Sequence, residues 1–224
     1  MNVRQNLDHI ISRIDDACLR ANRHPDEITI IGVTKYVTIE RAEALINAGI
    51  KNIGENRTDE LLNKYNEIGD AVNWHFIGTL QSRKVKEVVD KIDTIHSLDR
   101  ISIAKQIESR SDKQIDCFVQ VNVSGEAAKF GLTPDDVMPF IESLAPFKKV
   151  RVVGLMTMAP HTNNEEEIRS VFSTLAQLRD NIAEKSYSHA PCQYLSMGMS
   201  QDFEIAIEEG ATHIRLGSKL VGSN

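Results

Sequence analysis

Ile28-Thr29-Ile30-Ile31-Gly32-Val33-Thr34-Lys35 is an apolar run, rich in β-branched residues, that ends on a lysine. Pro25 and Asp26 precede the run, and this combination predicts a buried strand. A lysine is rare inside a buried strand, but at the carboxyl end it can point into the mouth where α/β folds bind ligands. Partly desolvated there, Lys35 could act as an amine nucleophile toward an aldehyde. The alternative is a lysine whose ammonium merely reaches solvent at a strand end.

Seven further strand-like segments follow the first, and helical patterns separate them. The expected strands span residues 28–35, 51–56, 74–78, 94–98, 117–123, 150–158, 194–197 and 213–217. Between them, apolar residues recur at three- and four-residue spacing, which is typical of helices packed on one face. The alternation predicts an α/β fold, a closed (β/α)8 TIM barrel that forms a single domain over residues 1–224. An open doubly wound sheet is the alternative.

One predicted helix precedes the first strand and so lies outside this alternation. Residues 3–21 carry one apolar stripe ahead of the first strand, and the chain stops a few residues past the eighth strand. No room therefore remains for a final helix, and we expect the N-terminal helix to cover the barrel seam in its place.

Composition argues against several classes of protein. The net charge is −6, and no basic stripe stands out, which argues against nucleic acid as a partner. No apolar run approaches the roughly 18 residues needed to cross a membrane, and the N-terminus has no secretory signal. Cys18, Cys117 and Cys192 fit no zinc or redox spacing, so no metal site is expected and all three are predicted to be reduced thiols. These features predict a cytoplasmic protein.

In a barrel of this type the active face lies at the carboxyl ends of the strands. Residues expected there are Lys35, Asn56, His75 to Gly78, Asn122, Ser124, Met156, Ser196 to Ser200, Arg215, Gly217 and Ser218. The turn from Ser196 to Ser200 enters a helix, and Gly217-Ser218 forms a second small turn, so their amides can bind an anion. Strands seven and eight are the usual phosphate corner of this fold. The alternative for Ser200 is a simple helix N-cap.

Arg215 occupies an apolar strand, where a buried guanidinium needs a partner. One interpretation is a structural ion pair with Glu204 or Glu208. The other is a donor to a ring nitrogen or a carboxylate of a ligand. A phosphate corner, an interior lysine and this arginine together favour an aldehyde cofactor with a phosphate and a ring nitrogen, and pyridoxal 5'-phosphate (PLP) meets all three requirements.

Several segments in chain order resemble a known family. They are Val33-Thr34-Lys35, Ile53-Gly54-Glu55-Asn56, Trp74-His75-Phe76-Ile77-Gly78, Leu80-Gln81-Ser82, Val121-Asn122-Val123-Ser124, Gly154-Leu155-Met156, Leu195-Ser196-Met197-Gly198-Met199-Ser200 and Ile214-Arg215-Leu216-Gly217. The chain resembles the PLP homeostasis proteins, the YggS/PROSC-like family, which shares the fold of the N-terminal barrel domain of alanine racemase.

The resemblance implies a role for each of ten residues. It implies a Schiff base between Lys35 and the PLP aldehyde, and Arg215 near the pyridine nitrogen. It places the phosphate near Ser200, Gly217 and Ser218. The implied pocket lining is Asn56, His75, Met156, Ser196 and Met197.

Racemisation on PLP needs two bases, one for each face of the substrate carbon. In alanine racemase the second base is a tyrosine from a second domain and a partner subunit, and none of the four tyrosines here matches that element. An arginine opposite the ring nitrogen also weakens the electron sink. These features favour a PLP-binding protein of vitamin B6 homeostasis, a monomer without significant turnover, which holds the cofactor and delivers it to apo PLP-dependent enzymes by transimination. A PLP-dependent racemase or lyase of low activity and a PLP-free Schiff-base aldolase are the alternatives.

Overall fold

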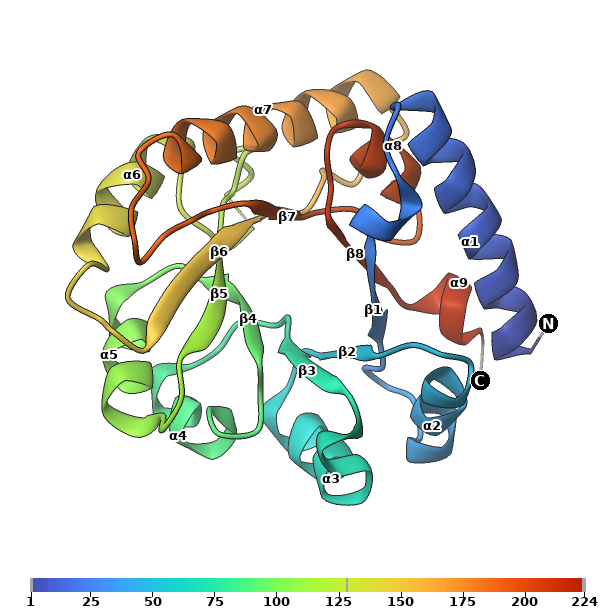
Figure 1. Cartoon of the computed structure of the whole chain (residues 1–224), viewed down its shortest axis with the longest axis horizontal. Helices are drawn as coiled ribbons and strands as arrows, with labels where there is room; N and C mark the ends of the chain where they lie inside the picture. The colour runs from blue at the N-terminus through green and yellow to red at the C-terminus, as the bar shows by residue number, and fades with distance from the viewer. Residues whose placement is uncertain (1, 128, 223–224) are drawn as a thin grey trace.

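Eight parallel strands alternate with helices and close into a barrel in the computed structural model, which describes residues 2–127 and 129–222 (Figure 1). The strands are β1 Thr29–Val33, β2 Asn52–Glu55, β3 Asn73–Phe76, β4 Thr94–Leu98, β5 Ile115–Gln120, β6 Val150–Met156, β7 Tyr194–Ser196 and β8 His213–Leu216. Each strand pairs with the next one in the chain, and β8 returns to pair with β1 through Ile31 and Arg215 among others. The predicted TIM barrel is confirmed, and the open sheet is wrong.

Helices surround the barrel on all sides (Figure 1). They are α1 Val3–Arg20, α2 Ile39–Asn47, α3 Thr58–Ile68, α4 Val85–Val88, α5 Ile101–Arg110, α6 Pro134–Ser143, α7 Glu165–Ala183, α8 Phe203–Glu208 and α9 Ser218–Val221, with short 3₁₀ turns η1 Pro25–Glu27, η2 Gly69–Ala71 and η3 Ser82–Lys84. The single turn of α9 follows β8, where the sequence analysis expects no helix. In the part of the chain that the structure describes, no helix is long and apolar enough to span a bilayer.

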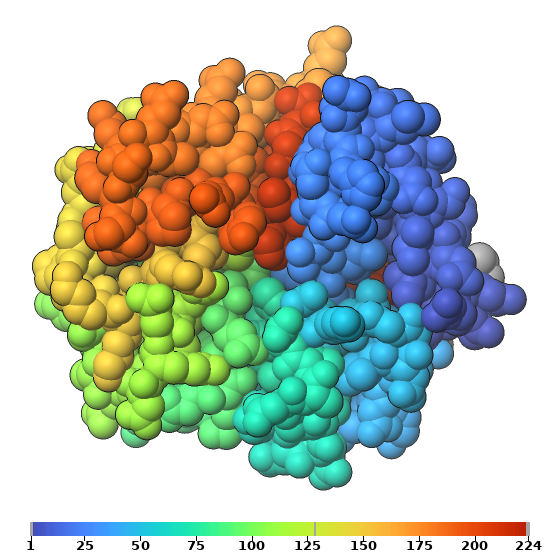
Figure 2. All heavy atoms as spheres, in the orientation of Figure 1, coloured from blue at the N-terminus to red at the C-terminus, as the bar shows by residue number. Residues whose placement is uncertain are grey.

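The N-terminal helix α1 covers the seam where β8 meets β1. It packs against α8, α9 and α2, and the space-filling view shows the blue N-terminal segment beside the red C-terminal one (Figure 2). Its apolar stripe is buried, including Leu7 and Ile10, and Arg13 forms an ion pair with Glu204 of α8. The predicted position of this helix is therefore confirmed.

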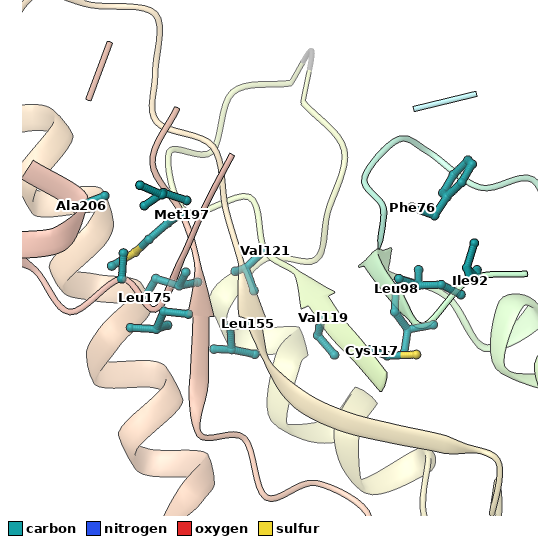
Figure 3. Packing of buried hydrophobic residues seen from close by; sticks show 14 of the residues in the cluster. Phe76, Ile92, Leu98, Cys117, Val119, Val121, Leu155, Leu175, Met197 and Ala206 are labelled. Carbon is teal, nitrogen blue, oxygen red and sulfur yellow. The ribbon is translucent and has the colours of Figure 1, made fainter. Parts of the chain in front are cut away.

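The strands bury both faces, as expected for a parallel barrel. The large core lies mostly between strands and helices (Figure 3). A small separate cluster of Phe118, Val153 and Met156 packs with Met158. The domain boundaries, residues 1–224, stay a prediction, and residues 1, 128 and 223–224 lie outside the described residues.

Candidate functional site

A cavity of about 400 Å³ opens where the strands of the barrel end. Its lining residues are Val33, Lys35, Asn56, Ile77, Gly78, Thr79, Gln120, Phe130, Met158, Met199, Ser200, Gln201, Arg215, Gly217 and Ser218. A second hollow, of about 510 Å³, lies beside it between the segments around His161 and Asp202, and the two share Met199 and Gln201. The first cavity is the one that contains the predicted lysine, arginine and serine side chains.

Lys35 stands at the rim of this cavity. Strand β1 ends at Val33, so Lys35 falls in the turn that follows, next to Tyr36 with its φ of +66°. The Lys35 side chain is exposed, and its Nζ lies 5.9 Å from the centre of the Tyr36 ring. The protein alone therefore desolvates this lysine less than the sequence-based hypothesis expects, because the strand ends two residues before it.

A buried ion pair anchors the backbone just before Lys35. Lys64 Nζ donates to the backbone oxygen of Thr34 at 3.0 Å and to Glu55 Oε1 at 2.8 Å. The Thr34 hydroxyl also donates to Glu55 Oε1, at 2.5 Å. Burial raises the pKa of the Glu55 carboxyl, against the opposing effect of Lys64 and of the Thr34 hydroxyl. Sequence reasoning missed Lys64, although a lysine on the apolar face of the α3 pattern could have signalled it.

Ser200, Gly217 and Ser218 form one side of the cavity. The N-cap of α8 is Asp202, whose carboxylate accepts from the backbone N–H of Met199 at 2.6 Å. The expectation that Ser200 caps this helix is thus wrong. Among the described residues, no hydrogen bond uses the hydroxyls of Ser200 and Ser218 or the backbone N–H groups of Ser200, Gly217 and Ser218. This side of the cavity therefore offers donors that the protein itself does not satisfy, as an anion site requires.

Arg215 lies at the base of the cavity and is only 5% exposed. Its guanidinium donates to Ser196 Oγ at 2.6 Å and to the backbone oxygen of Thr157 at 2.9 Å. Glu204 and Glu208 pair instead with arginines on α1 and α7, so the alternative of a structural ion pair between Arg215 and either carboxylate is wrong. Burial lowers the pKa of Arg215 to about 10, which leaves the guanidinium charged at neutral pH.

Asn56 completes the set of predicted residues that the structure brings to the cavity. It follows β2, and its Oδ1 is buried without a hydrogen-bond partner among the described residues. A buried polar atom of this kind usually has a partner, so the cavity wall holds an acceptor for a ligand or a water molecule. Six of the ten predicted residues therefore meet here: Lys35, Asn56, Ser200, Arg215, Gly217 and Ser218.

The other four predicted residues do not reach the cavity wall. His75 and Ser196 are buried inside the barrel, behind Arg215, and Met156 belongs to the interior cluster with Phe118. Met197 directly follows β7 and belongs to the large hydrophobic core. It packs near Leu175 of α7 and Ala206 of α8 (Figure 3).

Some lining residues had no part in the sequence-based site. Gln120 lines the cavity, and its Nε2 donates to the backbone oxygen of Phe130 at 3.2 Å. A glutamine at the end of an apolar strand was a signal that could have identified it. Phe130 lies in a loop, where no periodic pattern signals its position, whereas Met199 belongs to the turn from Ser196 to Ser200 that the sequence predicts at this face. Among the described residues, no three His, Cys, Asp or Glu side chains gather as a metal site would require.

Comparisons with known proteins agree over almost the full chain. The family model described as "Alanine racemase, N-terminal domain" matches residues 6–224. The Pyridoxal phosphate homeostasis protein of Aquifex aeolicus (strain VF5) is 42% identical over 226 residues, which cover 99% of this chain and 98% of that protein.

Two solved structures extend the comparison. PipY of Synechococcus elongatus PCC7942, determined with PLP bound, is 28% identical with a TM-score of 0.85, covering 99% of this chain and 100% of PipY. Alanine racemase of Clostridium difficile 630 is 17% identical with a TM-score of 0.78, and the match covers 100% of this chain but 57% of the racemase. At that identity the racemase shows the fold alone.

Proposed function

Because this chain belongs to the family of pyridoxal phosphate homeostasis proteins, within the alanine racemase N-terminal fold, we propose that it binds PLP in the cavity at the barrel mouth. It holds the cofactor and releases it to apo PLP-dependent enzymes, without significant turnover of its own. The observation that carries this proposal is the meeting of Lys35, Arg215 and a set of unsatisfied donors around one cavity.

The cavity fits PLP in size and in chemistry. About 400 Å³ lies within the range of small-molecule sites, and the lining mixes apolar side chains with a few polar ones. The free donors of Ser200, Gly217 and Ser218 suit a phosphate. The unpartnered Oδ1 of Asn56 adds an acceptor.

PLP would supply an aldehyde that reacts reversibly with primary amines. Lys35 offers the one primary amine among the described lining residues and would hold the aldehyde covalently until an incoming amine displaces it. Ser200, Gly217 and Ser218 would bind the phosphate. Arg215, charged and fixed by two acceptors, would meet the ring.

The lining also supports a role without turnover. Lys35 and Arg215 are the titratable side chains among its described residues, and Arg215 stays charged at neutral pH. Racemisation needs a base on each face of the substrate carbon, and Lys35 has no such counterpart among the described lining residues of this cavity. Tyr65 and Tyr187 hydrogen-bond to Asp70 and Glu142 outside the cavity lining.

An absorption spectrum of the purified protein with added PLP tests the binding. We expect a visible band in the wild type, loss of that band in Lys35→Ala, and borohydride trapping of the cofactor on the peptide that contains Lys35. Lys84→Ala is the matched control, because Lys84 lines a neighbouring hollow at the same rim, and this variant should keep the band. A colourless wild type would overturn the proposal and favour the aldolase.

Turnover and delivery need separate assays. We expect the loaded protein to leave the chirality of alanine and serine unchanged, and to restore activity to an apo PLP-dependent enzyme. Rapid racemisation or elimination would contradict the proposed role and favour a racemase or lyase.

A further inference from the structure

A line of polar side chains crosses the barrel interior beneath the cavity. We call it the interior network; its hydrogen bonds join Asn52 Oδ1 to His75 Nε2 at 3.0 Å, His75 Nδ1 to His96 Nε2 at 2.9 Å, His96 Nδ1 to Ser196 Oγ at 2.8 Å and Ser196 Oγ to Arg215 Nη1 at 2.6 Å. Its members come from β2, β3, β4, β7 and β8. His75, His96 and Ser196 are at most 4% exposed and do not line the cavity.

The directions of the hydrogen bonds in the interior network can be followed from Asn52, at the end away from Arg215. A carboxamide oxygen only accepts, and Asn52 Oδ1 also accepts from Asn73 Nδ2 at 3.1 Å. With the Asn52 carboxamide oriented as in the structure, His75 donates to it through Nε2–H. Burial lowers the pKa of His75 to about 3, so the ring is neutral and its Nδ1 carries a lone pair.

The remaining hydrogen bonds of the interior network lead from His75 to Arg215 at the base of the cavity. The lone pair on His75 Nδ1 accepts from His96 Nε2–H, and burial lowers the pKa of His96 as well, so its Nδ1 is also an acceptor. The Ser196 hydroxyl must then donate to His96 Nδ1. This leaves the lone pairs of Ser196 Oγ facing the guanidinium of Arg215.

Arg215 depends on this arrangement because no carboxylate among the described residues forms an ion pair with it. Its acceptors are Ser196 Oγ and the backbone oxygen of Thr157, both neutral. Asp202 attracts it electrostatically but is hydrogen-bonded to Met199. The interior network thus sets the orientation of a guanidinium whose charge no carboxylate in contact neutralises.

We propose that Ser196, His96 and His75 are positioning residues that hold Arg215 as a fixed hydrogen-bond donor toward the ring of bound PLP. This inference rests on the proposed function. It makes the spectrum and affinity of the bound cofactor depend on a histidine that the cofactor does not touch.

Nitrogen-15 NMR of the histidine rings in the wild-type protein without cofactor tests the network itself. We expect both His75 and His96 to be neutral at about pH 7.5, each with its proton on Nε2. A proton on Nδ1 of either ring, or a charged ring, would overturn the proposal whether or not PLP binds.

The positioning role is tested by PLP titration of His75→Phe, with His213→Phe as the matched control. His213 is a half-buried histidine at the start of β8, with its Nδ1 hydrogen-bonded to the Thr212 hydroxyl outside the interior network. We expect His75→Phe to shift the visible absorption maximum and to weaken PLP binding about threefold to tenfold, as for a lost hydrogen bond. His213→Phe should change neither.

Equal effects of the two variants would indicate a general packing defect and overturn the role. If His75→Phe fails to fold, Ser196→Ala provides the same test, and Ser196→Thr, which keeps the hydroxyl, should restore the wild-type spectrum. An unchanged spectrum and affinity in Ser196→Ala would refute the role alone. A wild type without a visible band would refute the proposed function and this role with it.

Discussion

Buried histidines are the side chains through which this protein should respond to acid. Burial lowers the pKa of His75 to about 3 and that of His213 to about 4, and it lowers that of His96 as well. Below about pH 6.5 the unfolded chain takes up protons on these rings while the folded protein does not. Their contribution to stability is therefore present above that pH and is lost as the pH falls toward the folded values.

Replacing one of these histidines should make the free energy of unfolding depend less strongly on pH in the acid range. In His213→Phe, we expect the free energy of unfolding to fall less steeply between pH 6 and 4.5, by about 1.4 kcal/mol per pH unit, because one proton fewer is taken up on unfolding. Urea unfolding at several pH values measures this slope. Parallel slopes for wild type and variant would contradict the assigned burial of a neutral ring.

The pair of Glu55 and Lys64 is the second residue-scale feature, since both side chains are at most 1% exposed. Lys64→Met leaves the Glu55 carboxyl without its cation, and we expect a loss of about 3–5 kcal/mol in the free energy of unfolding. Adding Glu55→Gln to that variant should recover part of the loss, because it removes the isolated charge. Urea unfolding of the single and double variants measures both effects.

The loss in Lys64→Met should also depend on pH. Burial already raises the pKa of Glu55 above its ordinary 4.5, and removing Lys64 removes an opposing influence. A carboxyl with a raised folded pKa stabilises the protein less as the pH rises above 4.5. The variant should therefore lose more stability at pH 8 than at pH 5, and the reverse order would refute this account.

At the scale of elements, α1 substitutes for a full-length eighth barrel helix, since α9 is only Ser218–Val221. The helix α1 begins with a capping box between Asn2 and Gln5, which satisfies two backbone N–H groups. Its buried face closes the seam between β8 and β1. The helix is thus part of the barrel wall, although it precedes the first strand.

Two neighbouring isoleucines of α1 differ in burial, so replacing each in turn tests whether the buried face of the helix stabilises the barrel. Ile10 is 1% exposed and Ile11 is 42% exposed. We expect Ile10→Ala to lower the free energy of unfolding by about 2–5 kcal/mol, because it leaves a cavity at the seam. Ile11→Ala should stay within about 0.5 kcal/mol. Equal losses in urea unfolding would show that α1 does not close the barrel.

At the scale of the whole molecule, the barrel closes on itself and its eight strands leave no unpaired edge. The helices α1 and α9, near the two ends of the described chain, pack against each other (Figure 1). A sheet without an unpaired edge supports the predicted monomer.

We expect light scattering coupled to size exclusion to give a mass near 25.1 kDa, with and without PLP. A single cooperative unfolding transition should accompany it, since closure makes every strand depend on both neighbours. A stable dimer mass, independent of protein concentration, would refute the prediction.

The alternation of strands and helices, and most of the residues at the mouth of the barrel, could be predicted from the sequence. Buried strands are short apolar runs between helical patterns, and residues just after such runs must lie at the carboxyl face. Lys35, Ser200, Arg215, Gly217 and Ser218 could be placed on that ground, together with the family resemblance. The strands themselves are mostly shorter than predicted, because apolar residues continue into the turns.

Which side chains face the interior of the barrel could not be predicted in this way. The strands bury polar as well as apolar residues, so the pattern of polarity does not show that Ser196 lies inside the barrel and Met197 in the core outside it. The hydrogen-bond partners of Arg215 could not be predicted either, because they lie in other segments that the closed barrel brings next to it. Phe130 reaches the cavity from a loop, and loop positions follow no repeating pattern. Contacts between distant segments depend on the closed barrel, and local sequence does not encode them.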